Sequence, residues 1–487
     1  MHRQDFDAIV VGSGPNGLAA AITLQQKGLS VLLLEGKNQV GGGLRSAELT
    51  LPGFTHDICS AIHPLAAGSP FFNTLPLHEH GLEYIYPPVA AAHPFDDGTA
   101  GLLAGSVDDT ARGLGADREA YRKLLLPLVE DWPELAPAIL GPLHFPAYPL
   151  DMAKFGLKAL TPSTFLAKRF HTTNARGLWA GMAAHSMQPL SNAATSAIAL
   201  VLMIAAHVKG WPLPRRGSMA IADALASYFI SLGGKIETGT HVQSLSQLPS
   251  SRALLLDLTP RQLLQLGGHR WSSIYRWQLE RYRYGMGVFK IDWALDERIP
   301  WTAPGCRQAG TVHIGATLEE IAAGEELTWK GGYPERPFVL LAQQSVFDPS
   351  RAPQGKQTGW AYCHVPNGSV KDMTEIIEKQ VERFAPGFRD RILARHVMDT
   401  VQLEDYNPNY IGGDINGGVI DLGQLFTRPA LRASPYRTSV KGIYICSSST
   451  PPGGGVHGMC GYHAAQRALK DVFPHIPASY DSYTSPR

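Results

Sequence analysis

The N-terminal residues alternate between apolar runs and turn residues, and this pattern predicts a strand, a helix and a second strand. Residues 7–11 (DAIVV) form a continuous apolar run, which is typical of a parallel strand covered on both faces. Residues 18–26 (LAAAITLQQ) place apolar side chains at helical spacing, and Lys27 and Gly28 supply a cationic last turn and a C-cap. The next apolar run, residues 30–34 (SVLLL), predicts the second strand.

Several later segments carry equally simple patterns. Residues 193–208 predict a buried or interfacial helix, because this apolar run is shorter than the roughly 20 residues of a membrane span. Residues 217–232 predict a helix, and residues 233–242 predict a turn that feeds two short strands. Short apolar strands are also expected at residues 253–258 and 442–446.

Two segments in the second half of the chain mix apolar and charged positions. Residues 287–295 alternate, with Lys290 and Asp292 on the face opposite the apolar side chains, and this predicts a half-buried antiparallel strand. Residues 270–284 interleave basic and aromatic side chains, as a nucleic-acid platform does. The simpler interpretation is a helix with a solvated basic face and an apolar face. That apolar face would contain Ile274, Tyr275, Trp277, Leu279 and Tyr282.

A glycine motif joins the first strand to the first helix and matches GxGxxG. Gly12 permits a tight turn, Gly14 lets the backbone approach a pyrophosphate, and Gly17 lets the helix pack closely on the strand. Glu35 follows the second strand at the distance expected of the acid that binds an adenosine ribose. The complete order of strand, glycines, helix, strand and acid predicts a dinucleotide site. Its glycine loop consists of Gly12, Ser13, Gly14, Pro15, Asn16 and Gly17.

Composition excludes some functions. Lys and Arg number 43 against 42 Asp and Glu, so no overall charge attracts nucleic acid, and no nucleic-acid partner is expected. The five cysteines have neither CxxC nor zinc-finger spacing, and we interpret them as reduced thiols. The first six residues run straight into a strand pattern without a secretion signal. The chain is therefore predicted to be cytoplasmic, and a peripheral membrane contact is left open.

A second glycine cluster resembles a motif of the FAD-containing amine oxidase and phytoene desaturase superfamily. It spans residues 36–46 (GKNQVGGGLRS), and the resemblance implies that its glycines pass the cofactor and that Arg45 meets the pyrophosphate or flavin side. Residues 51–60 resemble the segment that approaches the flavin ring, although Cys59 stands where glycine is more usual. The resemblance also places Val242 against the adenine. These three segments contribute Gly36, Gly42, Gly43, Leu44, Arg45, Ser60 and Val242 to the predicted FAD site.

The C-terminal region resembles the closing motif of phytoene desaturases. A turn at residues 447–452 leads into a glycine loop that opens a helix at residues 462–470, and a helix N-terminus can stabilise the negative charge of a reduced flavin. His457 stands where proline is frequent, and it is the candidate for tuning flavin charge or moving a proton. A ring that only satisfies backbone groups is the alternative. The residues expected here are Ser448, Gly455, Val456, His457 and Met459.

Further stretches, including residues 257–262 and 406–418, resemble a bacterial phytoene desaturase-related subgroup that includes the pyridine nucleotide-disulfide oxidoreductase domain 2 type. The predicted fold class is α/β plus α+β. A Rossmann-like FAD-binding domain is assembled from residues 1–69, 215–265 and 406–487. Residues 70–214 and 266–405 form a substrate domain of mixed sheet and helices.

The resemblance implies an FAD-dependent desaturase, dehydrogenase or isomerase that acts on a hydrophobic, isoprenoid- or lipid-like molecule. Oxygen or a quinone is the expected electron acceptor, because the sequence has no second GxGxxG motif that would bind a nicotinamide nucleotide. A flavin amine oxidase and a non-catalytic FAD protein that senses redox state or binds a partner are the alternatives. The oligomeric state is left open.

Other chemistry has weaker support in the sequence. The histidines show no HExxH, and no metal site is predicted. The serines at residues 447–449 are not in a GxSxG elbow, which argues against hydrolysis. Four further histidines belong to segments that could line the substrate pocket, although a structural role is the simpler interpretation of each. They are His56, His63, His185 and His207.

Overall fold

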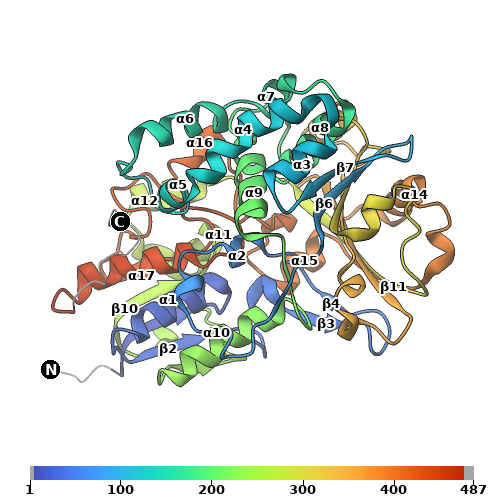
Figure 1. Cartoon of the computed structure of the whole chain (residues 1–487). Coiled ribbons are helices and arrows are strands. Elements are labelled where there is room, and N and C mark those ends of the chain that lie inside the picture. The colour runs from blue at the N-terminus through green and yellow to red at the C-terminus, as the bar shows by residue number, and fades with distance from the viewer. Residues whose placement is uncertain (1–4, 477–487) are drawn as a thin grey trace.

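The computed structural model describes residues 5–476, and two separate β-sheets organise the fold (Figure 1). The first sheet has five strands in the order β16-β10-β1-β2-β9, and every neighbouring pair is parallel. Its strands come from both ends and the middle of the chain. They are β1 (Phe6–Val11), β2 (Val31–Leu34), β9 (Lys235–Glu237), β10 (Ser251–Leu256) and β16 (Ile443–Ile445).

Helices cover both faces of this parallel sheet, which explains why its strands are continuous apolar runs. On one face α1 (Pro15–Gln25) packs against α10 (Met219–Ser231), α17 (Met459–Val472) and strands β1 and β2. On the other face Ile9, Leu32 and Leu34 share a buried cluster with side chains of α11 (Pro260–Gly267) and α12 (Ser273–Glu280). This architecture is Rossmann-like, as the N-terminal pattern predicts.

The helix α12 corrects the apolar face predicted for residues 270–284. Its buried side chains are Tyr275 and Leu279, whereas Ile274 and Trp277 are exposed, so the apolar face is narrower than predicted. The helix also packs on the five-stranded sheet, although the predicted division placed it in the substrate part. The hydrophobic pattern could not show this packing, because it indicates which face of a helix is buried and not which element covers that face.

The second sheet has seven strands in the order β15-β11-β14-β13-β12-β6-β7. All neighbouring pairs are antiparallel except β12 and β6, so the sheet is mixed, in agreement with the predicted fold class. Its strands are β6 (Val89–Pro94), β7 (Ala100–Ala104), β11 (Gly287–Leu295), β12 (Ala309–Ile314), β13 (Val339–Ala342), β14 (Gln357–Val365) and β15 (Ile392–Met398).

The strand β11 has the predicted bounds but is not half-buried. All nine of its residues are buried, and Lys290 and Asp292 form an ion pair inside the protein. The alternation correctly places both on one face, opposite Phe289 and Ile291. That face does not meet solvent, because His56 of β4 (Thr55–Asp57) and Trp360 of β14 pack against it.

A layer of helices covers the second sheet, along the upper edge of Figure 1. The helix α9 confirms the interfacial helix predicted for residues 193–208. Within residues 5–476, no helix combines the length and apolarity needed to cross a membrane. The helices of this layer are α3 (Val107–Gly113), α4 (Arg118–Glu130), α5 (Trp132–Ile139), α6 (Pro149–Ala159), α7 (Ser163–Leu166), α8 (Thr173–Ala184) and α9 (Thr195–Lys209). The helix α13 (Leu318–Trp329) packs on α8, and α14 (Thr374–Phe384) lies at the right of Figure 1 and packs on Phe289 and Ile291 of β11.

The remaining predicted elements differ only in detail. The predicted helix at 217–232 is α10, whereas residues 233–242 form the single strand β9 instead of two strands, and Val242 lies in a loop. The strands of the parallel sheet all fall in the segments assigned to the FAD-binding part. The exact division of the chain into two domains stays a prediction.

Candidate functional site

A cavity of about 560 Å³ lies where the carboxyl ends of the parallel strands meet the second sheet. Val11, Glu35 and Asp257 line it, and each stands at or directly after the end of a parallel strand. Trp360 and Tyr362 of β14 line it from the second sheet. A pocket at this edge of an open α/β sheet is the expected place for a nucleotide.

The first glycine loop is shaped by close backbone contacts. Gly12 has a φ of +98°, a conformation that glycine adopts at no steric cost. A Cβ atom on Gly17 would lie 1.9 Å from the carbonyl oxygen of Gly12, so only glycine lets α1 begin this close to β1. The amide of Gly17 donates to Asp257 Oδ2 at 3.0 Å. These contacts match the roles predicted for the first and third glycines.

Glu35 is held at the end of β2 by several donors. Its Oε2 accepts hydrogen bonds from the amide of Ser13 at 3.1 Å and from the Ser13 hydroxyl at 2.5 Å. Its Oε1 accepts from the amide of Lys37 at 2.8 Å and lies 3.1 Å from Arg45 Nη2. Both Glu35 and Arg45 line the cavity, so they can still reach a ligand there.

The second glycine cluster lies against the first and against residues 406–410. A Cβ atom on Gly42 would lie 2.9 Å from Gly14 Cα, and one on Gly43 would lie 2.1 Å from the hydroxyl oxygen of Tyr410. The Tyr406 hydroxyl donates to the Gly42 carbonyl at 2.7 Å. Both glycines are thus required for the wall of the cavity to close. Tyr406 and Tyr410 were not predicted as site residues, although residues 406–418 resemble the phytoene desaturase-related subgroup.

The structure brings most of the predicted cofactor residues to this one cavity. Three do not line it: Gly17, whose amide bonds to Asp257, and His457 and Met459 at the start of α17. The backbone cradle of glycines and the acid at the strand end fit a dinucleotide such as FAD. The predicted residues that line the cavity are Gly12, Ser13, Gly14, Pro15, Asn16, Glu35, Gly36, Gly42, Gly43, Leu44, Arg45, Ser60, Val242, Ser448, Gly455 and Val456.

His457 lies behind the cavity wall and not on its surface. Its ring is buried, and its Nδ1 accepts a hydrogen bond from the amide of Met459 at 3.0 Å. Burial lowers the pKa of His457 to about 4, so the ring is neutral at neutral pH. This position favours the alternative, a ring that satisfies the backbone of its own loop, and the catalytic role of His457 stays a prediction.

The other candidate histidines divide into two groups. His63 and His185 line the cavity, and burial lowers their pKa values to about 4 and about 3. His56 is buried 3.6 Å from Asp292, and His207 contacts the Tyr121 hydroxyl at 2.7 Å. Neither His56 nor His207 lines the cavity, which favours a structural role for both.

The second sheet and α9 give the cavity an apolar and aromatic part, which we call the apolar half and which includes Leu202, Leu340, Trp360 and Tyr362. The rings of Trp360 and Tyr362 lie 5.4 Å apart between centroids, nearly perpendicular to each other. The Trp211 indole donates to the Thr311 hydroxyl at 2.9 Å. Trp211, Trp360 and Tyr362 were not predicted to line the site. The alternation of aromatic and small residues at 360–363 (WAYC) was the available signal, but nothing local shows which face meets a ligand.

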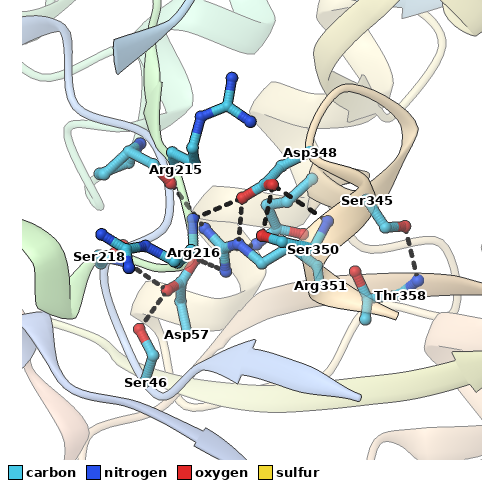
Figure 2. Close-up of polar contacts among 12 residues, drawn as sticks. Ser46, Asp57, Arg215, Arg216, Ser218, Ser345, Asp348, Ser350, Arg351 and Thr358 are labelled. Atoms are coloured by element: carbon cyan, nitrogen blue, oxygen red, sulfur yellow. Dashed lines mark hydrogen bonds and ion pairs between the residues drawn. The ribbon is translucent and has the colours of Figure 1, made fainter. Parts of the chain in front are cut away.

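A buried charge network positions the wall between Asp57 and His63 (Figure 2). Arg351 Nη1 lies 3.0 Å from Asp57 Oδ2, and Arg351 Nε lies 3.1 Å from Asp348 Oδ2. Asp57 Oδ1 accepts from the amide of Ser218 and the hydroxyl of Ser46, each at 2.7 Å. Burial opposes ionisation of Asp57, but the Arg351 charge and these hydrogen bonds hold its pKa below the usual value.

Asp257 carries the most perturbed carboxyl in the cofactor half of the cavity. Burial raises its pKa to about 7, and the nearby Glu35 charge adds to the rise. A Cβ atom on Gly14 would lie 2.9 Å from Asp257 Oδ2, so this carboxyl lies directly beside the glycine loop. Its protonation therefore changes the charge that a pyrophosphate would meet.

Comparison with known proteins agrees with the geometry. Residues 10–74 match the family described as an NAD(P)-binding Rossmann-like domain. The fold is similar to an oxidoreductase from Methanosarcina mazei, with a TM-score of 0.66 and 15% identity over 95% of this chain and 99% of that one. It is also similar to putrescine oxidase bound to putrescine, with a TM-score of 0.62 and 16% identity over 96% and 99% of the two chains.

The chain is accordingly similar to oxidoreductases of the phytoene desaturase and amine oxidase kind, and its cavity fits FAD. Within that class it is similar to mouse pyridine nucleotide-disulfide oxidoreductase domain-containing protein 2, with 26% identity over 96% of this chain and 94% of the relative. It is 22% identical to one of the polypeptides of limonene dehydrogenase from Castellaniella defragrans, over 96% and 95% of the chains. It is 23% identical to the lycopene-forming phytoene desaturase of Pseudescherichia vulneris, over 95% and 98%.

Proposed function

We propose that the chain desaturates, dehydrogenates or isomerises a hydrophobic, isoprenoid- or lipid-like substrate by hydride transfer to FAD. The observation that carries this proposal is the continuity of the cavity. Residues of the cofactor motifs and the apolar side chains of Met187, Leu202, Leu340 and Ile415 line the same cavity. Apolar walls of this kind bind apolar surface by removing it from water. The names of the limonene and phytoene relatives support a substrate of this class.

The charges in the cavity also favour an uncharged substrate. Among the described residues that line it, the only acids are Glu35 and Asp257, and both belong to the cofactor half. His63 and His185 are neutral, because burial lowers their pKa values far below neutral pH. Bound FAD would supply the two-electron acceptor, and the chain would hold the substrate against it in a site that excludes water. We propose oxygen or a quinone as the final acceptor.

An anaerobic reduction experiment tests the proposal. The purified protein with FAD is mixed with isoprenoid and lipid fractions, and loss of the visible flavin absorbance is followed. One fraction should bleach the flavin rapidly in the wild-type protein. Failure of every fraction to do so would favour the non-catalytic alternative.

Two variants on α9 test whether flavin reduction depends on the apolar half of the cavity. Leu202→Trp adds bulk to the apolar half and should slow reduction about ten-fold or more while FAD stays bound. Val201→Trp is the matched control, because Val201 neighbours it on the same helix but does not line the cavity. Equal rates in the two variants would contradict the assignment of the apolar half as the substrate site.

An amine oxidase is the second candidate, and the pair of Trp360 and Tyr362 favours it, because aromatic faces attract cations. The lack of an acid in the apolar half, among the described lining residues, weighs against an amine substrate. Peroxide formation on adding primary amines to the aerobic protein would support this candidate. Bleaching by a lipid fraction without any response to amines would eliminate it.

A further inference from the structure

Helix α6 and the loops beside it expose an unusual number of large apolar side chains. Phe145 is 86% exposed, Leu157 is 77% exposed, and Leu143, Leu150 and Phe165 are each more than half exposed. On α6 itself, Leu150 and Leu157 are seven residues apart and share one face, whereas Phe155 and Ala159 on another face are buried. The helix is therefore anchored by its inner face and presents leucines outward.

Basic side chains surround these apolar ones. Lys154 and Lys158 lie on α6, and Lys168 and Arg169 follow α7. Burial lowers the pKa of Lys158, and the neighbouring Arg169 and Lys154 charges add to this, which shows that the cations are close together. Asp151 pairs with Lys154 at 2.8 Å, and the Asp131 charge also acts on Lys154 and Lys158. We call this surface the α6 patch: Leu143, Phe145, Leu150, Leu157 and Phe165 with Lys154, Lys158, Lys168 and Arg169.

We propose that the α6 patch docks the protein on an anionic lipid surface, without crossing it. An amphipathic helix with leucine and phenylalanine outward and lysines at its sides matches the interfacial mode of membrane binding. The chain as a whole has a net charge of only +1, so the local excess of cations is a feature of this surface. Negative lipid headgroups complement that excess.

A second copy of the chain fits the same surface less well. A two-fold contact would place the patch against itself and so bring two sets of four cations together, with only Asp131 and Asp151 near them on each side. A peptide groove is also a poor description, because the patch consists of a single helix with its flanking segments, at the upper edge of Figure 1. The lipid surface satisfies both the apolar and the cationic groups.

The location connects the patch to the cavity. Helix α6 packs on α9, and Leu202 of α9 lines the apolar half of the cavity. The parallel sheet with α1 and α10 lies at the opposite edge of the molecule (Figure 1). Docking through α6 would thus place the apolar half of the site toward the membrane, where hydrophobic molecules dissolve. The inference goes beyond the proposed function and does not depend on it.

Vesicle co-sedimentation of the full chain with FAD bound tests this inference without measuring turnover. We expect binding to phosphatidylcholine vesicles that contain phosphatidylglycerol, with weaker binding to phosphatidylcholine alone and at high salt. Leu150→Ser with Leu157→Ser should lower the partition coefficient about ten-fold or more on both vesicles. Lys158→Gln with Lys168→Gln should lower binding to the anionic vesicles several-fold and leave the zwitterionic binding unchanged.

The control is Ile274→Ser with Leu431→Ser, which removes two equally exposed apolar side chains far from α6 in the sequence. These changes are at exposed sites apart from the half-buried Lys158, so thermal unfolding and flavin absorbance should match the wild type. Equal vesicle binding by the control and the α6 variants, or no binding by the wild type, would overturn the inference. A dimer that light scattering detects and that the leucine variants dissociate would assign the patch to a second copy instead.

Discussion

Lys290 and Asp292 place opposite charges side by side inside the protein, with His56 and His396 each 3.6 Å from an Asp292 oxygen. Removing two charges from water is costly, and their attraction compensates only while both are present. The Lys290 ammonium also lies 5.9 Å from the centre of the Trp360 ring, which lines the cavity. The pair therefore links the stability of β11 to the shape of the apolar half.

Loss of one member of this pair should destabilise the fold strongly. Lys290→Met leaves the Asp292 carboxylate buried without its partner, and we expect the free energy of unfolding to fall by about 3–5 kcal/mol. Denaturant unfolding measures this, and Lys290→Met with Asp292→Leu should recover part of the loss. Lys356→Met, in the exposed pair with Asp296, should barely change the midpoint. A similar loss in both single variants would contradict the role of burial.

Asp257 makes FAD affinity depend on pH. Its pKa is raised to about 7 by burial and the Glu35 charge, so the carboxyl is neutral below pH 7 and ionised above it. An ionised carboxylate beside the glycine loop repels a pyrophosphate. We expect the Kd for FAD to rise about ten-fold between one pH unit below and one above that pKa. Fluorescence titration of the FAD-free protein measures this directly.

The matched variant for this pH dependence is Asp257→Asn, which keeps the shape and removes the charge. Its amide cannot ionise, so its FAD affinity should stay constant across the same pH range. A pH dependence that persists unchanged in Asp257→Asn would assign the titration to another group.

At the scale of elements, Arg351 joins the loop after β13 to β4 and to the segment that precedes α10. It pairs with Asp57 and Asp348 and donates to the Pro214 carbonyl at 3.2 Å, with no exposed surface on any of the three charged side chains. Residues 57–63 continue from Asp57 into the cavity wall at Cys59, Ser60 and His63. The network therefore positions a wall of the site from elements far apart in sequence.

Arg351→Met should lower the free energy of unfolding by about 3 kcal/mol or more, because two buried carboxylates lose their cation. Hydrogen exchange at residues 57–63 should also speed up, since Asp57 anchors that segment. Arg215→Met is the control, because Arg215 lies beside the network in Figure 2 but pairs with Glu83 in solvent. Unchanged exchange at residues 57–63 in Arg351→Met would refute the anchoring role.

Elements with local signals could be predicted, and elements defined by partners could not. The unit from β1 to β2 follows from contiguous apolar runs and glycines whose roles are local. The buried polar face of β11 depends on what packs against it, namely His56 and Trp360, which lie far away in the sequence. The same holds for Trp360 and Tyr362, whose alternation marks a strand but not a ligand site.

At the scale of the whole molecule, the cofactor half of the cavity draws on segments from both ends and the middle of the chain. Resemblance to known motifs predicted most of its lining, because glycine spacing and a strand-end acid are properties of short segments. The packing of α12 on the parallel sheet could not be predicted in this way. It depends on the three-dimensional path of a chain that returns to the same sheet several times.

Because the separated segments meet at the cofactor cavity, FAD should stabilise the whole fold and not one loop. Binding to the native state alone adds about 2.7 kcal/mol at a free concentration about one hundred times Kd. Thermal unfolding of the FAD-free protein, before and after FAD is added, measures this stabilisation as a single shifted transition.

In Gly14→Ala the added Cβ would lie 2.9 Å from Asp257 Oδ2, so the shift caused by FAD should largely disappear. Gly113→Ala, with open space around its Cβ, should keep the full shift. Two separate transitions, of which FAD moves only one, would show that the parallel sheet and the mixed sheet unfold independently.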